Sequence, residues 1–458
     1  MGRCYDAKSY MTSSWWRPNA DRCRSASRQH FVVPFGGDGS RCSIPSSSLS
    51  KHAAAFALQR ATSVRPIEDI AVPMASKYLP TYYEFFAGGG MARAGLGDQW
   101  RCSFANDIST KKGEAYAANW GDEDLWIGDV FKVKTKQLPG HADLAWGSFP
   151  CQDLSLAGNG EGLAGERSGA FWGFWKNIKA LSREGRKPRM IVLENVYGTL
   201  TSRDGKDFEQ IGKAVAAEGY VFGAVVIDAV HFVPQSRPRL FVIGIDASLA
   251  VPGDAYADLP TPAWHPDALI RAYNRLPKAA KNAWRWWNPP APTTRIASMD
   301  SIVEDNLQGV EWHTPEQTLR LMEMMSDVNR RKVIEAQRSG SIKVGTVYRR
   351  TRNGVQRAEV RFDGVAGCLR TPAGGSSRQT IMVVDGAKVR SRLISPREMA
   401  RLMGLEEGYV LPNRYNDAYH LLGDGVVVPV VRHIREHLLD AVLRANQTTT
   451  TATQCRRA

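Results

Sequence analysis

The stretch TYYEFFAGGGMARAGL, from Thr81 to Leu96, has the pattern of a short aromatic strand, a glycine-rich turn and a helix. Glycines directly after a strand let the backbone approach a nucleotide-like ligand, and the following helix offers its N-terminal amide groups to that ligand. Many parallel-sheet proteins have a glycine-rich first turn for purely structural reasons. This stretch alone therefore leaves both interpretations open.

Further strand-like runs follow along the chain. They are RCSFANDI (101–108), HADLAWGSF (141–149), RMIVLENV (189–196), GAVVIDA (223–229) and RLFVIGI (239–245). The intervening segments are long enough for helices, and the pattern stops near Asp246. Strands that alternate with helices predict an α/β fold, in which helices cover both faces of a mostly parallel sheet.

The composition narrows the class of protein. The chain has 458 residues and a formal net charge of +14, which favours a polyanionic partner, although charge alone does not identify one. Its seven cysteines include no CxxC pair, so we expect no metal site and no secreted disulfide framework, and instead a reducing, cytoplasmic setting. No apolar run approaches the roughly 20 residues that span a bilayer, so we expect no membrane partner.

Changes in composition and in the pattern of apolar residues along the chain predict its domain organisation. We expect a disordered basic extension over 1–76, an α/β domain over 77–246, a smaller inserted domain over 247–365, a return to the α/β domain over 366–443, and a disordered tail over 444–458. A translation start at Met74 is an alternative that would remove the extension. Ser395, followed by Pro396 and Glu398, predicts a helix start.

Two aspartates follow predicted strands. Asp107 lies about 20 residues past the glycines, where a carboxylate takes the hydroxyl groups of a ribose, and Asp129 lies where it could accept a bond from an adenine amine. Either residue could equally be a helix N-cap. His433 and His437 lack the acidic companion of a zinc-protease motif, so we expect a surface feature of the last helix.

Cys151 follows Pro150 at the end of a predicted strand, beside a glycine-rich run. A lone cysteine is most often an inert core residue, but this position lies at the carboxyl edge of the sheet, where ligands bind. Glu194 ends another apolar strand, where a buried carboxyl needs an ion-pair partner or a proton. A raised pKa would suit an acid that donates to a ring nitrogen.

Gln235, Arg237 and Arg239 alternate at the start of a predicted strand, which would place all three side chains on one face. Such a face suits a polar or anionic ligand, or a structural ladder of salt bridges.

The joint order of these motifs is more specific than any one of them. An FxGxG turn, then ND, GD, PCQ, ENV, QxRxR and a late RExxRLMGL resemble the motifs of the DNA cytosine-5 methyltransferases of bacteria and phages. The resemblance covers about Tyr82 to Leu439, apart from the inserted region. It implies a Rossmann-like methyltransferase fold, with an inserted target recognition domain that reads double-stranded DNA.

The resemblance also implies a cofactor, S-adenosylmethionine, and a set of site residues. Those assigned to the cofactor are Phe86, Ala87, Gly88, Gly89, Gly90, Asp107, Ile108, Asp129, Val130, Pro150, Asp424 and Gly425. Those assigned to catalysis are Cys151, Glu194, Arg237 and Arg239, and those assigned to the substrate are Gln152, Ser155, Gln235, Arg370 and Arg378. The target cytosine would be flipped out of the duplex, and Cys151 would attack its carbon 6.

One stretch departs from the family pattern. The family usually has Gly-Asn-(Ala/Ser)-Val near its C-terminal end, whereas this chain has Gly423-Asp424-Gly425-Val426. An aspartate there would repel the cofactor's methionine carboxylate, or would accept a bond from its ammonium group.

The expected activity is sequence-specific methylation by a monomer on DNA, with a restriction endonuclease as the functional partner. A cytosine methylase acting on transfer RNA is a second hypothesis, although that branch has a smaller recognition region. A catalytically silent DNA-binding relative is a third, and the retained Cys151 and Glu194 argue against it. A nicotinamide oxidoreductase would leave the PCQ and ENV motifs unexplained.

Overall fold

The computed structural model describes residues 78–150, 169–292, 297–304, 306–352, 354–371 and 378–455. The expected N-terminal extension and three predicted site residues, Cys151, Gln152 and Ser155, lie outside the described residues. No helix in the described part of the chain is long and apolar enough to cross a membrane.

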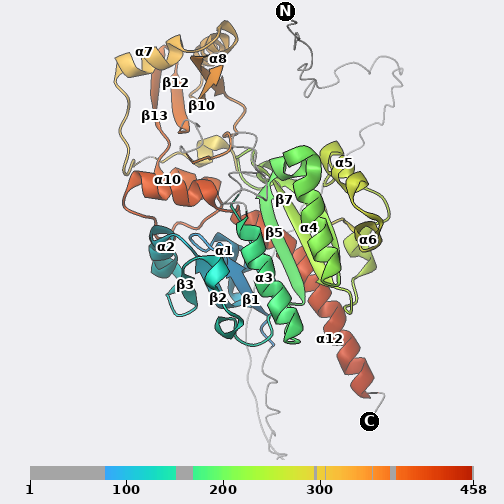
Figure 1. The fold of residues 1–458 in the computed structure, drawn as a ribbon. Coiled ribbons are helices and arrows are strands. Elements are labelled where there is room, and N and C mark those ends of the chain that lie inside the picture. Colours follow the sequence, from blue (N-terminus) through green and yellow to red (C-terminus); the bar gives the residue numbers. More distant parts are fainter. Residues whose placement is uncertain are drawn as a thin grey trace, which may run out of the picture. The chain divides into compact units, whose positions relative to one another are not determined.

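The central element is a sheet with the strand order β3-β2-β1-β4-β5-β7-β6 (Figure 1). Its strands are β1 (Thr81–Phe85), β2 (Arg101–Asp107), β3 (Leu125–Ile127), β4 (Leu144–Gly147), β5 (Met190–Val196), β6 (Tyr220–Asp228) and β7 (Pro238–Asp246). All neighbouring pairs are parallel except those of β7, which runs antiparallel to β5 and β6. The mostly parallel sheet predicted from the alternating pattern is confirmed.

Both faces of this sheet are buried, as near-continuous apolar strands require. Along β1, Tyr82 and Tyr83 point to opposite faces and join two different hydrophobic clusters. The helices that contribute to the cluster around Tyr82 include α1 (Met91–Leu96), α2 (Thr110–Trp120) and α11 (Val428–Ile434). Those around Tyr83 include α3 (Ala170–Arg183), α4 (Lys206–Ala217) and α5 (Asp267–Arg275). The sheet thus has helices on both faces, as predicted.

A second, antiparallel sheet has the order β11-β10-β12-β13. Its strands are β10 (Lys343–Arg352), β11 (Val355–Arg361), β12 (Thr380–Asp385) and β13 (Lys388–Leu393). Residues of α7 (Pro315–Glu323) and α8 (Asp327–Arg338) pack on it in a separate core that includes Val333, Val347 and Met382.

The bounds of this smaller unit differ from the predicted 247–365. Strand β12 lies between β10 and β13, so the sheet continues to Leu393, because strand pairing is not local in sequence. Conversely, β8 (Tyr256–Ala257), α6 (Lys278–Asn282) and β9 (Trp286–Trp287) precede it. In that region the ring of Trp284 packs 5.2 Å from the ring of Phe222 on β6, which joins this segment to the large sheet.

The C-terminal part returns to the large sheet through α9 (Pro396–Leu402), α10 (Tyr415–Asp424), α11 and α12 (Asp440–Cys455). The predicted helix start at Ser395 is confirmed, since Glu398 N donates to Ser395 Oγ (3.1 Å) and Ser395 N to Glu398 Oε2 (2.8 Å). The tail expected to be disordered from 444 instead continues α12 to Cys455. Near the start of this tail, the side chain of Asn446 forms hydrogen bonds with both the N–H and the carbonyl of Ala250.

A fully buried ion pair joins the smaller sheet to the C-terminal helices. Arg392 on β13 donates two bonds to Glu398 on α9, at 2.7 and 2.5 Å, and neither side chain is exposed. The guanidinium of Arg392 also lies 5.1 Å from the ring centre of Trp312. Removal of one of two desolvated charges leaves the other buried without a counter-charge, which is strongly destabilising.

We expect Glu398→Gln to destabilise the protein by about 3–5 kcal/mol, because it leaves the Arg392 charge buried without a counter-charge. The measurement is the midpoint of urea unfolding followed by tryptophan fluorescence. The matched control is Glu407→Gln, which breaks an exposed pair with Arg401 and should cost less than about 1 kcal/mol. Equal shifts for the two variants would contradict a special role of the buried pair.

Two histidines of the described segments are buried, His265 and His433, and His433 corrects the expectation of a surface feature. His433 is only 7% exposed, and its ring lies 5.2 Å from the ring of Phe232 and 5.9 Å from that of Trp264. Burial, assisted by His437, lowers the pKa of His433 to about 4. Burial likewise lowers the pKa of His265 to about 4.

These two pKa values predict that stability falls as the pH drops from about 6.5 to 4. The unfolded chain binds protons at its histidines near pH 6.5, whereas the folded state keeps His265 and His433 neutral until about pH 4. Unfolding therefore takes up protons in this window. The melting temperature, measured between pH 7.5 and 5, should fall less steeply for His433→Phe than for the wild type. A matched His231→Gln variant, at an exposed position, should keep the wild-type slope.

Candidate active site

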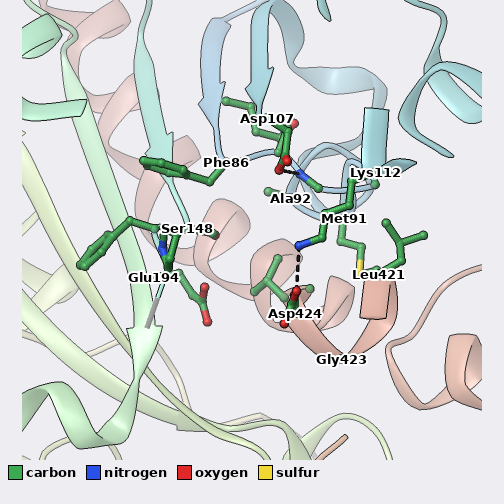
Figure 2. A pocket seen from close by; sticks show the side chains of 18 of the residues that line it. Phe86, Met91, Ala92, Asp107, Lys112, Ser148, Glu194, Leu421, Gly423 and Asp424 are labelled. Atoms are coloured by element: carbon green, nitrogen blue, oxygen red, sulfur yellow. Dashed lines mark hydrogen bonds and ion pairs between the residues drawn. The ribbon is translucent and has the colours of Figure 1, made fainter. Parts of the chain in front are cut away.

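A cavity lies at the carboxyl ends of β1, β2, β4 and β5 (Figure 2). The residues predicted for the site that line it are Phe86, Ala87, Gly88, Gly89, Asp107, Ile108, Pro150, Glu194, Arg237, Arg239, Asp424 and Gly425. They come from segments more than 300 positions apart in the sequence. The fold thus brings the glycine turn, the ENV motif, the arginines and the late Gly-Asp-Gly stretch to one place.

The glycine turn needs backbone conformations that few side chains tolerate. Gly88 has a φ of 56° and Phe86 a φ of 60°, which is strained for a bulky residue. A Cβ at Gly89 would collide with the hydroxyl group of Tyr409. The turn is therefore shaped by its surroundings, and its backbone faces the cavity.

Asp107 fixes the turn from the neighbouring strand. Gly88 N donates to Asp107 Oδ2 (2.9 Å), and Ser109 N donates to Asp107 Oδ1 (2.8 Å). The N-cap of α2 is Ser109, so Asp107 is not the helix cap that the sequence left open. Asp107 is 7% exposed and lies at the cavity wall.

Three residues predicted to bind the cofactor do not line the cavity. Gly90 lies beneath the turn against Trp120, where a Cβ would clash. Asp129 caps the short 3-10 helix 130–132 and accepts a bond from Phe131 N (3.0 Å), which is the structural alternative considered for it. Val130 is buried in the hydrophobic cluster between the sheet and α3.

Glu194 and Arg239 form an ion pair within the cavity. Arg239 Nε lies 3.2 Å from Glu194 Oε1, and Val196 is the register partner of Arg239 between β5 and β7. Burial raises the pKa of Glu194, against the opposing effects of Arg239, Arg237 and a hydrogen bond from Ser148. The two alternatives considered for Glu194, an ion pair and a raised pKa, are therefore both realised.

Arg237 is 1% exposed and bonds backbone carbonyls. Its Nη1 donates to Leu369 O (2.7 Å), and its Nη2 donates to Gly423 O (2.8 Å) and Gly425 O (2.7 Å). Its Nε has no hydrogen-bond partner among the described residues. Arg237 thus holds the turn that carries Asp424.

Gln235 was predicted to bind substrate, but it is fully buried and does not line the cavity. Its Nε2 donates to Leu402 O (2.8 Å), and its Oε1 accepts from Leu369 N (3.0 Å). The expected alternation of side chains fails here because β7 begins only at Pro238. Gln235 is a structural link between the start of β7 and α9.

The two predicted substrate arginines lie off the cavity as well. Arg370 is exposed, and Arg378 donates to Asn416 Oδ1 (2.6 Å) beside the ring of Tyr415. Asn195 of the ENV motif binds the backbone at the end of the segment 144–150. Its Nδ2 donates to Phe149 O (3.0 Å), which holds the chain where it leaves the described residues.

The residues without a predicted role include Cys368, which contacts Arg237, and Lys112, which lines the cavity. The Sγ of Cys368 accepts from Arg237 Nη1 (3.3 Å). Burial opposes ionisation of this thiol, but the neighbouring arginines together lower its pKa. Lys112 lines the cavity and pairs with Asp424 at 2.8 Å. A lysine in the first turn of a helix and a cysteine in a loop carry no motif, so no signal in one sequence would have found them.

Comparison with solved structures places the fold. The Dnmt2 methyltransferase of S. pombe superposes with a TM-score of 0.51 at 16% identity, covering 79% of this chain and 98% of that one. The Entamoeba histolytica methyltransferase EhMeth gives a TM-score of 0.53 at 14% identity, covering 80% and 99%. The Rossmann-like methyltransferase fold is confirmed.

Comparison with sequences places the family. The type II methyltransferase M1.ScrFI of Lactococcus lactis subsp. cremoris is 24% identical over 370 residues, which are 80% of this chain and 79% of the relative. M.HpaII of Haemophilus parainfluenzae is 25% identical over 382 residues, covering 79% and 89%. The family model for C-5 cytosine-specific DNA methylases matches residues 81–440. The chain therefore belongs to the C-5 cytosine-specific DNA methylase family and is a DNA (cytosine-5-)-methyltransferase.

Proposed function

We propose that this methyltransferase uses S-adenosylmethionine to methylate a flipped-out cytosine in a specific duplex DNA sequence, through a covalent Cys151 adduct. The observation that carries the proposal is the Glu194–Arg239 pair in the same cavity as the glycine turn and Asp107. One cavity thus offers groups for a nucleoside cofactor and groups for a pyrimidine ring. Pro150, directly before Cys151, also lines it.

The residues of the cavity fit S-adenosylmethionine. The bare backbone of Gly88, with open space at its Cβ position, leaves room for a nucleoside, and the Asp107 carboxylate matches the two hydroxyl groups of a ribose. When bound, the cofactor supplies an electrophilic methyl group. The assignment of Asp129 and Val130 to the adenine stays a prediction.

The chemistry of cytosine explains the other groups. Carbon 5 is a poor nucleophile, so the Cys151 thiolate adds to carbon 6 and turns the ring into an enamine. Negative charge builds on the ring in this step. The Glu194 carboxyl, which burial helps to keep protonated, donates to ring nitrogen 3, and Arg239 donates to the base oxygen. Carbon 5 of the enamine would then take the methyl group that the bound cofactor supplies. Loss of the carbon 5 proton and expulsion of the Cys151 thiolate restore the aromatic ring and the free enzyme.

The smaller sheet offers a basic surface for DNA. On β11, Ala358 and Val360 pack toward α7 and α8, so Arg357 projects from the opposite face. Arg357 pairs in register with Arg350 of β10, and both side chains are exposed. Arginines on a two-stranded ribbon suit phosphate contacts and guanine edges in the major groove. We assign the unit from α7 to β13 as the target recognition domain.

A role in restriction-modification follows from the relatives, which are named as type II methyltransferases. The enzyme would act as a monomer on DNA and protect sites that a cognate endonuclease cleaves.

The nucleophile can be trapped with duplex DNA in which the target cytosine carries fluorine at carbon 5. Fluorine cannot leave as a proton does, so the adduct should persist, and the wild type should give a denaturant-resistant protein–DNA complex in the presence of S-adenosylmethionine. Cys151→Ser should give none, and its methylation rate should drop by at least about a thousandfold. Cys102→Ser, at a core thiol, is the matched control and should still form the complex. An adduct formed by Cys151→Ser would remove Cys151 as the nucleophile.

Labelled methyl groups from S-adenosylmethionine should appear as 5-methylcytosine in duplex DNA and not in transfer RNA. Label in transfer RNA alone would favour the RNA methylase, and no label in either would favour the silent relative.

The double variant Arg350→Ala/Arg357→Ala should weaken duplex binding by about tenfold and reduce its salt dependence, because it removes two cationic groups from the proposed DNA face. Arg338→Ala, on the helical side of the same unit, should bind DNA as the wild type does.

A further inference from the structure

A close pair of opposite charges lies on the wall of the cavity. Lys112, in the first turn of α2, and Asp424, the last residue of α10, have their Nζ and Oδ2 atoms 2.8 Å apart (Figure 2). Their side chains are 25% and 43% exposed, so a ligand entering the cavity can reach both. Asp424 stands where the family usually has a neutral asparagine, and Lys112 supplies the charge that compensates it.

The backbone under each charge is fixed by groups of the same cavity. Arg237 bonds the carbonyls of Gly423 and Gly425 on either side of Asp424. Lys112 N donates to Ser109 Oγ (3.4 Å), and Ser109 N in turn bonds Asp107. The two charges therefore have defined positions relative to Asp107, the residue proposed to hold the ribose.

Joining α2 to α10 does not depend on this pair alone. The neighbouring Lys111 pairs with Asp417 between the same two helices, also at 2.8 Å, and neither residue lines the cavity. Ion pairs as exposed as these contribute little to stability. The position of Lys112 and Asp424 on the cavity wall therefore calls for a role other than joining helices.

The amino-acid end of S-adenosylmethionine is a zwitterion, with an ammonium and a carboxylate group on one carbon. A contacting cation and anion are its complement, because each charge of the ligand meets an opposite charge of the protein. If Lys112 and Asp424 part and each contacts the oppositely charged group of the ligand, the net charge of the cavity wall stays unchanged. This exchange also replaces one charge-assisted contact by two.

We propose that Lys112 and Asp424 form the recognition site for this zwitterion: their ion pair opens, Lys112 takes the carboxylate and Asp424 takes the ammonium. The inference rests on the proposed use of S-adenosylmethionine. It assigns a cofactor-selecting role to Lys112, and it explains how the chain carries an aspartate where the cofactor's carboxylate must approach.

Two nucleosides distinguish binding by the Lys112–Asp424 pair from binding by the rest of the cavity. S-adenosylhomocysteine has the zwitterion, whereas 5′-methylthioadenosine has the same nucleoside and lacks it. Binding of each, by isothermal titration calorimetry, is compared for the wild type, Lys112→Ala, Asp424→Asn, the double variant Lys112→Ala/Asp424→Asn, and the matched control Lys111→Ala.

Lys112→Ala should weaken S-adenosylhomocysteine binding by about tenfold or more, because it removes the carboxylate's partner and leaves Asp424 to repel it. Adding Asp424→Asn to that variant should restore part of the affinity, which loss of a merely structural ion pair would not do. 5′-Methylthioadenosine should bind all five proteins alike, and Lys111→Ala should bind both ligands as the wild type does.

Two outcomes would overturn the inference alone: unchanged affinity of Lys112→Ala for S-adenosylhomocysteine, or an equal loss for both nucleosides. A wild type that binds neither nucleoside would instead overturn the proposed cofactor. Circular dichroism melting of Lys112→Ala beside Lys111→Ala shows whether the variants fold equally well.

Discussion

The site depends on the hydrogen bonds that the buried guanidinium group of Arg237 donates to backbone carbonyls. This group joins three segments that lie far apart in the sequence: the start of β7, the loop at Leu369, and the turn around Asp424. A buried charge is tolerated only where polar groups replace its water, and here backbone carbonyls do so. Two of those carbonyls, of Gly423 and Gly425, belong to the cavity wall, so the groups that bind the arginine also shape the cavity.

The electrostatics of the cavity oppose what burial alone would give. Burial drives Glu194 toward its neutral form, and the adjacent arginines restrain this effect. The same arginines drive the thiol of Cys368 toward its anionic form, against burial. Arg239 thus lies between a carboxyl group whose pKa is raised and a thiol whose pKa is lowered, since it contacts both. The two arginines, two positions apart in the sequence, act on both groups in the same direction, because each of them favours the anionic form of the carboxyl and of the thiol.

Sequence reasoning succeeded where the signal is local. The parallel sheet followed from alternating strands and helices, and the helix start at Ser395 from its own capping residues. Most residues of the glycine turn, together with Glu194 and Arg239, line the cavity as the family motifs implied.

Where sequence reasoning failed, the deciding contact was distant. Gln235 was misassigned because its partners at Leu369 and Leu402 cannot be read from its own strand pattern. The end of the smaller sheet was misplaced because β12 returns to pair with β10. Lys112 was overlooked because its partner Asp424 lies 312 positions away.

The segment around Ala366 has a consequence for how the two sheets communicate. It connects β11 to β12 within the smaller sheet, yet Ala366 N donates to Pro234 O, and Ser236 N donates to Ala366 O at the entry to β7. A few positions further on, the same segment supplies the Leu369 carbonyl to Arg237. Any displacement of the smaller sheet would therefore act on the backbone carbonyl that Arg237 binds, through the covalent chain and these three hydrogen bonds.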